Sequence, residues 1–103
     1  MKRYIAFDIG DKRIGIAVSS LLGDMVLPVE TYHRKNLKDD LNYLVNAATG
    51  RSVNGIVCGL PLNVDGTPSI QTEKTAFFIE KLKFNNVLDK YTILLIFLSF
   101  ILN

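Results

Sequence analysis

The stretch from Tyr4 to Ser20 constrains the possible fold more than any other part of this sequence. Two runs rich in β-branched and aromatic residues, 4–9 and 14–19, flank the short segment 10–13, Gly-Asp-Lys-Arg. Two strand-like runs separated by a short glycine-containing loop predict a β-hairpin. The chain has 103 residues, which is the length of one small domain, so this hairpin is expected to belong to a single sheet.

Asp8 is unusual because it lies near the end of an otherwise apolar run, where a charge is costly unless something compensates it. Gly10 permits a tight turn and the close approach of a ligand, while Lys12 and Arg13 place two cations at the turn. A carboxylate, a glycine and two basic residues in this arrangement suit a metal-assisted phosphate site. An Asp near a Gly also caps many ordinary turns, and spacing alone favours that structural interpretation.

The next part of the sequence predicts a third strand, a helix and a fourth strand. Gly23-Asp24 indicates a turn, and residues 25–33 indicate a strand at or near a sheet edge, because the proline within it cannot donate to a ladder. Residues 36–50 place their apolar side chains on one helical stripe, with the first residue suited to be the N-cap and the last a good stop. The short apolar run 53–59 follows this helix, so a parallel return into the same sheet is expected.

A second helix is expected from Ser69, a good N-cap, to about residue 85. Its inward-facing residues are predicted to be Ala76, Phe77, Ile79 and Leu82. The predicted order of elements is therefore β-β-β-α-β-α. Because their neighbours are apolar, four aromatic residues are expected in the core rather than as base-stacking platforms: Tyr4, Phe77, Phe78 and Phe84.

Residues 91–102 contain no charged residue. As a helix they would reach about 18 Å, which is short of the roughly 30 Å of a bilayer core, so no membrane span is expected. The expected structure is one more buried strand. Because strands usually run only about 5–6 residues, the surplus apolar residues would be exposed and prone to aggregation.

The charge distribution favours a polyanionic partner. The net charge is only +2, but the first 38 residues hold more Lys and Arg than Asp and Glu. His33 is expected at the surface, and Arg34, Lys35 and Lys38 as the solvated start of a helix rather than a dedicated nucleic-acid patch. Cys58 lies in an apolar run and is expected to be buried and inert. Together with an N-terminus unlike a signal peptide, it predicts a cytoplasmic location.

Two longer motifs are similar to those of one protein family. Residues 7–19, Phe-Asp-Ile-Gly-Asp-Lys-Arg-Ile-Gly-Ile-Ala-Val-Ser, resemble the signature Asp-x-Gly-x-Lys-Arg-x-Gly-x-Ala. Residues 59–66, Gly-Leu-Pro-Leu-Asn-Val-Asp-Gly, resemble the loop Gly-Leu-Pro-x-Asn-x-Asp-Gly. Both motifs are those of the YqgF-type family of Holliday-junction resolvase-like proteins, now described as pre-16S rRNA nucleases, in the ribonuclease H-like superfamily. The resemblance covers residues 3–84 and includes Asp40-Leu41 and Phe78.

The resemblance implies a ribonuclease H-like α/β fold, with three antiparallel strands followed by α-β-α in a mixed sheet on which the helices pack. It also implies a cytoplasmic, metal-dependent nuclease that hydrolyses phosphodiester bonds and processes the 5′ end of pre-16S rRNA. The implied substrate is nucleic acid, either pre-rRNA or branched DNA. Ribosomal particles are further candidate partners, and no membrane is involved.

The same resemblance places the first catalytic carboxylate on Asp8, which would bind a divalent metal, Mg²⁺ or Mn²⁺. Lys12 and Arg13 would hold backbone phosphates. If the loop that follows the fourth strand overhangs the same sheet edge as Asp8, Asn63 would contact nucleic acid and Asp65 the metal. The alternative for these two residues is a structural Asx-type turn before the glycine that follows them.

The sequence departs from the family pattern after residue 86. The family carries an acidic block, Asp-Glu-Arg, on the strand after the second helix and a further Asp near the C-terminus. Neither has a counterpart in residues 87–103, where the one acidic residue, Asp89, precedes the apolar run. We therefore expect residues 1–86 to form a ribonuclease H-like domain that lacks its C-terminal part. Residues 87–103 are interpreted as an atypical apolar tail, typical of a truncated or frame-shifted end. One carboxylate, with Asp65 as a second, is a poor two-metal site, so weak or no activity is expected of this chain alone.

Two other functions remain open. A nucleotide-phosphate binder of the actin and sugar-kinase class uses a similar Asp-x-Gly hairpin, but the 59–66 loop has no role there and 103 residues are too few for a two-lobed ATP cleft. Measurable ATP binding by calorimetry would favour it. A non-catalytic RNA- or ribosome-binding module would bind RNA with a steep salt dependence and without cleavage.

Overall fold

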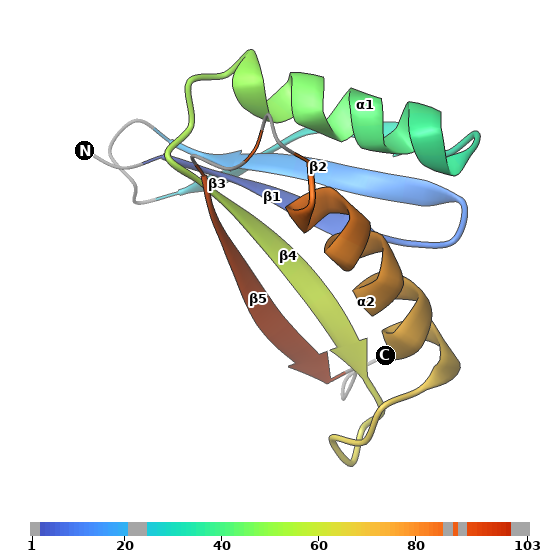
Figure 1. Cartoon of the computed structure of the whole chain (residues 1–103). Helices are drawn as coiled ribbons and strands as arrows, with labels where there is room; N and C mark the ends of the chain where they lie inside the picture. The colour runs from blue at the N-terminus through green and yellow to red at the C-terminus, as the bar shows by residue number, and fades with distance from the viewer. Residues whose placement is uncertain (1–2, 21–24, 86–87, 89–90, 100–103) are drawn as a thin grey trace.

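A computed structural model describes residues 3–20, 25–85, 88 and 91–99, with side chains in the last segment placed only at 91, 93 and 95. Within these ranges a single sheet carries two helices on one of its faces (Figure 1). The elements in chain order are β1 (Tyr4–Ile9), β2 (Arg13–Ser19), β3 (Val26–His33), α1 (Leu37–Thr49), β4 (Gly55–Leu62), α2 (Ile70–Lys83) and β5 (Thr92–Ser99). The predicted order β-β-β-α-β-α is confirmed. The turn predicted at Gly23-Asp24 lies outside the described residues.

The sheet has five strands in the order β3-β2-β1-β4-β5. β1 and β2 form the predicted hairpin, and β2 pairs antiparallel with β3, which lies at the edge as Pro28 predicts. β4 returns parallel to β1, with Phe7 opposite Cys58, and this confirms the expected parallel return. β4 begins two residues later than predicted and continues to Leu62 beside β5, beyond its last residue paired with β1.

Side-chain alternation along β1 separates the two faces of the sheet. Ile5, Phe7 and Ile9 are buried on the face that carries the helices, whereas Asp8 is exposed on the opposite face. One apolar core forms between the sheet and both helices, with α1 contributing Leu44, Val45 and Ala48 and α2 contributing Phe78, Ile79 and Leu82. No described helix covers the opposite face. There a hollow of about 340 Å³ is lined mainly by small and apolar residues, among them Ala6, Ala17, Val57 and Gly59.

Both helices begin, and α1 also ends, as their terminal residues predict, whereas α2 ends at Lys83, about two residues earlier than expected. Asn36 caps α1, with its side-chain oxygen accepting from the Asp39 N–H at 2.9 Å, and Gly50 follows the last helical residue. Ser69 caps α2 in a capping box with Thr72, in which each side chain bonds the backbone N–H of the other residue. The two helix positions are therefore fixed by local sequence.

The inward face of α2 differs from the prediction. Ile79 and Leu82 are buried as expected, but Ala76 is exposed, and so are Phe77 (57%) and Phe84 (75%), so their assignment to the core is wrong. The buried positions are instead Thr72, Thr75, Phe78, Ile79 and Leu82. The Thr72 hydroxyl donates to the carbonyl of Pro61 in β4, which fixes the rotation of the helix. Two threonines therefore occupy positions where a hydrophobic pattern would place apolar side chains.

The apolar C-terminal run contains the additional strand that was predicted. β5 pairs parallel with β4 at the edge of the sheet. Of its described side chains, Leu95 is 41% exposed, although a buried strand was expected. The described part of the chain contains no helix that is both long and apolar enough to cross a membrane. Residues 100–103 and the proposed boundary at 86–87 lie outside the described residues.

Candidate functional site

Asp8 lies near the end of β1, opposite Gly15 of β2, with its side chain exposed. It borders a hollow of about 410 Å³, here called the Asp8 hollow. The walls of this hollow are the last residues of β1, the β1–β2 turn, the end of β4 and the start of α2. Its lining residues are Asp8, Ile9, Gly10, Asp11, Pro61, Leu62, Asn63, Ser69 and Gln71.

Two glycines near Asp8 lie where a larger residue would come close to other atoms. Gly10 donates its N–H to the Arg13 carbonyl at 2.9 Å, and a Cβ at this position would lie 2.9 Å from that same oxygen. No other residue fits there without a backbone shift. A Cβ at Gly15 would meet the Asp8 Cβ at 3.6 Å, which is ordinary contact, so Gly15 leaves open space beside the carboxylate.

The two cations of the turn lie on different sides of it. Arg13 is the first residue of β2, and alternation with the buried Ile14 places it on the same face of the sheet as Asp8. Lys12 is also exposed, but it borders a second hollow between the two helices. The structure therefore brings Arg13, but not Lys12, to the face of the sheet that carries Asp8.

The loop after β4 is closed by its own polar side chains. Asn63 borders the Asp8 hollow, and its amide nitrogen donates to Thr67 Oγ1 at 3.0 Å and to the Pro68 carbonyl at 3.3 Å. Asp65 accepts from the N–H of Thr67 at 3.0 Å and from its hydroxyl at 2.6 Å, and these bonds lower the pKa of Asp65. Asp65 does not line the hollow. These bonds are those of the Asx-type alternative, and of the two residues only Asn63 lines the hollow together with Asp8.

Sequence reasoning gave no role to a second carboxylate, Asp11, that borders the same hollow. The Lys74 ammonium lies 3.8 Å from Asp11. With its amide nitrogen toward Asp11, Gln71 donates to that carboxylate at 3.1 Å while its oxygen accepts from Thr75 Oγ1 at 3.2 Å. These partners are about 60 residues away in the chain, so no local pattern could have revealed them. Only a prediction of the topology, with the start of α2 placed beside the β1–β2 turn, could have indicated these partners of Asp11.

The donor set of the Asp8 hollow fits a hard cation only partly. Asp8 and Asp11 offer carboxylates and Asn63 an amide oxygen, while Mg²⁺ typically takes one or two carboxylates with water and substrate phosphates completing its shell. In the described part of the chain, no three or more His, Cys, Asp or Glu residues cluster in a way that could hold a metal. The residues therefore fit a single ion that substrate helps to hold, and they do not form a complete two-metal cage.

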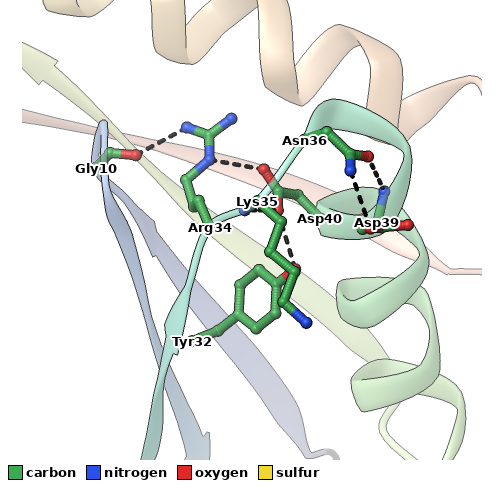
Figure 2. A network of polar contacts seen from close by, with 7 residues as sticks. All are labelled: Gly10, Tyr32, Arg34, Lys35, Asn36, Asp39 and Asp40. Atoms are coloured by element: carbon green, nitrogen blue, oxygen red, sulfur yellow. Dashed lines mark hydrogen bonds and ion pairs between the residues drawn. The ribbon is translucent and has the colours of Figure 1, made fainter.

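A buried ion pair fixes the turn beside Asp8 (Figure 2). Arg34 donates from Nη1 to the Gly10 carbonyl at 2.8 Å and from Nε to Asp40 Oδ2 at 2.9 Å. The other oxygen of Asp40 accepts from the Tyr32 hydroxyl and the Lys35 N–H, both at 2.9 Å. The Arg34 side chain is only 22% exposed, so its assignment to a solvated helix start is wrong, whereas Lys35, Lys38 and His33 are exposed as expected.

This network determines the ionisation of its members. Burial alone would raise the pKa of Asp40, but hydrogen bonds from the Lys35 amide, Arg34 and Tyr32 outweigh it and lower the pKa. Burial and the bond to Asp40 raise the pKa of Tyr32 to about 12. Burial likewise raises the pKa of the Cys58 thiol to about 12, which fits the predicted inert residue.

Comparison with known proteins places this sequence close to one family. The family model named RuvX, Holliday junction resolvase, matches residues 2–95. A protein of Fusobacterium nucleatum named "Putative pre-16S rRNA nuclease" is 43% identical over 83 residues, which are 81% of this chain and 59% of that protein. A protein of the same name from Ruegeria sp. is 39% identical over 82 residues, 80% of this chain and 52% of its own length. The chain thus spans little more than half the length of these relatives.

Among solved structures, an exopolyphosphatase from Cytophaga hutchinsonii superposes with a TM-score of 0.54. It is 10% identical, and the match covers 95% of this chain and 34% of the exopolyphosphatase. At this identity the likeness concerns the fold alone. The predicted ribonuclease H-like α/β arrangement is confirmed by the strand order and the family match together.

Proposed function

Because the chain belongs to the RuvX family of Holliday junction resolvases, we propose that its Asp8 hollow is a site for hydrolysis of phosphodiester bonds in nucleic acid. The observation that carries this proposal is the exposed Asp8 carboxylate at the open end of β1, in a hollow that it shares with Asp11 and Asn63. The proposed substrate is the 5′ region of pre-16S rRNA or branched DNA. Ribosomal particles are the proposed partner and the cytoplasm the proposed location.

Each residue of the hollow has a proposed task. Asp8 is the catalytic carboxylate and the principal ligand of a divalent cation, Mg²⁺ or Mn²⁺. When bound, such an ion neutralises charge on a phosphate oxygen and acidifies a water molecule. Arg13 binds a backbone phosphate on the same face of the sheet, and Asn63 contacts the substrate from the β4 loop. Asp65 is the weaker candidate for a metal ligand, because its carboxylate is engaged with Thr67.

We further propose that this chain alone cleaves slowly or not at all. Two-metal phosphodiester hydrolysis needs several converging carboxylates, and the described residues of the hollow offer two, of which Asp11 is engaged with Gln71 and Lys74. The same shortage favours the second candidate function, a module that binds RNA without cleaving it. Its signature is RNA affinity that falls steeply with salt while the strand stays intact.

The test is a cleavage assay with structured RNA and with four-way DNA junctions, in the presence of Mg²⁺ or Mn²⁺ and then of EDTA. Wild type, Asp8→Asn and Asp65→Asn are compared at equal concentration. The proposed site requires that any cleavage be metal-dependent, absent in Asp8→Asn and retained in Asp65→Asn. Rapid cleavage abolished by Asp8→Asn would overturn the proposed inactivity but support the site. Cleavage that persists in purified Asp8→Asn would refute the site itself.

A further inference from the structure

The hollow between the two helices, which Lys12 borders, is larger than the other two described above. Its volume is about 900 Å³, at the upper end of the range for ligand-binding clefts. Its walls are the β1–β2 turn with Asp11 and Lys12, the segment 33–37 that leads into α1, and residues of α2 that include Phe77 and Phe78. We call it the inter-helix hollow. Asp11 borders both this hollow and the Asp8 hollow, so the two lie next to each other at the β1–β2 turn.

Phe77 borders this hollow and is 57% exposed, although apolar neighbours predict a core position. The adjacent Phe78 is 2% exposed, and the Arg34 guanidinium covers its ring at 4.8 Å. The Lys81 ammonium lies 5.2 Å from the centre of the Phe77 ring. Phe77 therefore contributes little to the core and presents an aromatic ring beside a cation. An exposed aromatic ring of this kind is a platform on which a nucleobase can stack.

The charges of the inter-helix hollow suit a strand with few phosphates. Arg34 is neutralised by Asp40 at 2.9 Å, and Lys74 lies near Asp11 at 3.8 Å. Lys12 and Lys35 then face a single further acid, Glu73. This small excess of positive charge matches one or two phosphates of a single strand better than the dense charge of a duplex.

We propose that the inter-helix hollow binds a single-stranded segment of nucleic acid, with one base stacked on Phe77 and backbone phosphates held by Lys12 and Lys35. This inference rests on the proposed function, because the single-stranded segment would be the part of the nucleic-acid substrate that adjoins the nucleotides bound at Asp8. Such a strand would cross the β1–β2 turn, whose Asp11 borders both hollows and whose Gly10 carbonyl accepts a hydrogen bond from Arg34.

The experiment measures fluorescence anisotropy of a labelled single-stranded oligouridine in EDTA, where no metal-dependent cleavage occurs. Phe77→Ala should weaken binding by between about fivefold and about 100-fold, the range for loss of one base stack. Phe77→Tyr should restore it. Phe84→Ala is the matched control, because Phe84 is 75% exposed at the end of the same helix but does not border the hollow. Its affinity should equal that of wild type.

Two further measurements separate stacking from charge. Lys12→Gln should reduce the slope of log affinity against log salt by about 0.7, the value for one phosphate of a single strand, whereas Lys83→Gln should leave the slope unchanged. An abasic strand of equal length should bind wild type and Phe77→Ala with equal affinity. Thermal unfolding of each variant by circular dichroism verifies that it is folded.

The proposal is overturned if Phe77→Ala and Phe84→Ala bind oligouridine alike, or if the abasic strand binds wild type as tightly as oligouridine does. Its failure is distinct from failure of the proposed function. Cleavage that depends on Asp8 together with unchanged binding by Phe77→Ala would refute only the inter-helix hollow. Cleavage that persists in Asp8→Asn together with weakened oligouridine binding by Phe77→Ala would refute only the Asp8 site.

Discussion

Replacing Asp40 by asparagine should destabilise the fold strongly although the change is nearly isosteric. Asp40 is 1% exposed, and its two oxygens have different partners. Oδ1 accepts from Tyr32 and Lys35, while Oδ2 accepts from Arg34 Nε. An asparagine can keep its oxygen on the first two donors, but its NH₂ group then faces the guanidinium, donor against donor. The variant also leaves the positive charge of Arg34 without its partner.

The size of the effect follows from the burial of the pair. Breaking a fully buried ion pair by removing one partner costs about 3–5 kcal/mol. Because the Arg34 side chain keeps 22% exposure, water relieves part of this cost, and we expect about 3 kcal/mol for Asp40→Asn. Asp40→Ala should cost about 1–2 kcal/mol more, because the Tyr32 hydroxyl and the Lys35 N–H then lose their acceptor. Small domains have only about 5–15 kcal/mol to lose.

The assay is urea unfolding followed by circular dichroism. With a denaturant slope of about 1.5 kcal/mol/M, a loss of 3 kcal/mol should lower the midpoint of Asp40→Asn by about 2 M. The control is Asp39→Asn, one residue earlier and exposed, whose shift should be several times smaller. Equal midpoints for the two variants would refute the assignment of Asp40 as the buried anchor of this network.

The pH dependence of the same variants gives an independent check. The pKa of Asp40 is lower in the folded chain than its usual value, so its contribution is fully present above about pH 4 and is lost as the pH falls through the folded value. Asp40→Asn should therefore lose less stability on acidification than wild type. The pKa of Tyr32 is raised from 10.0 to about 12, so its contribution is present below pH 10 and is lost as the pH rises towards 12. An acid profile identical in wild type and Asp40→Asn would contradict this account.

Two other substitutions or treatments test separate parts of the structure. Gly10→Ala should lower the free energy of unfolding by about 1–3 kcal/mol, because its methyl group would lie 2.9 Å from the Arg13 carbonyl oxygen. The same urea titration measures this loss. Gly15→Ala, whose methyl group would make ordinary contact at 3.6 Å, should cost less. Cys58 should resist iodoacetamide at pH 8 in the folded chain and react once urea unfolds the chain. Mass spectrometry measures the extent of modification. Rapid modification without denaturant would contradict the burial of Cys58 and its raised pKa.

Local sequence predicted the parts of this fold that short-range physics controls. The hairpin follows from two strand-forming runs around a glycine-containing turn, the helix starts follow from Asn36 and Ser69, and the edge position of β3 follows from Pro28. The rotation of α2 was not predictable in the same way. The buried side of α2 includes Thr72, whose hydroxyl donates to the Pro61 carbonyl, together with Phe78, Ile79 and Leu82, and this rotation leaves Phe77 outside.

In the candidate site, too, the residues marked by local sequence were predictable and those defined by distant contacts were not. Asp8 could be located from sequence because an acid in an apolar strand is conspicuous, and Asn63 because its motif follows the strand beside β1. Asp11 could not be assigned, since its partners Gln71 and Lys74 lie far along the chain. Arg34 was misassigned for a related reason: nothing in a short run of basic residues marks which one will meet a buried acid.

Because side chains alternate along β1, substitutions at its odd-numbered and even-numbered positions should have different effects. Ile5, Phe7 and Ile9 meet the helices, so substitutions there should change how much folded chain a cell accumulates. The even-numbered positions between them face the side of the sheet where no described helix lies, and there only Asp8 carries a reactive group. A saturation scan of the six codons of β1 should therefore lower abundance at positions 5, 7 and 9, whereas changes at Asp8 should leave abundance unchanged and alter only metal or nucleic-acid binding.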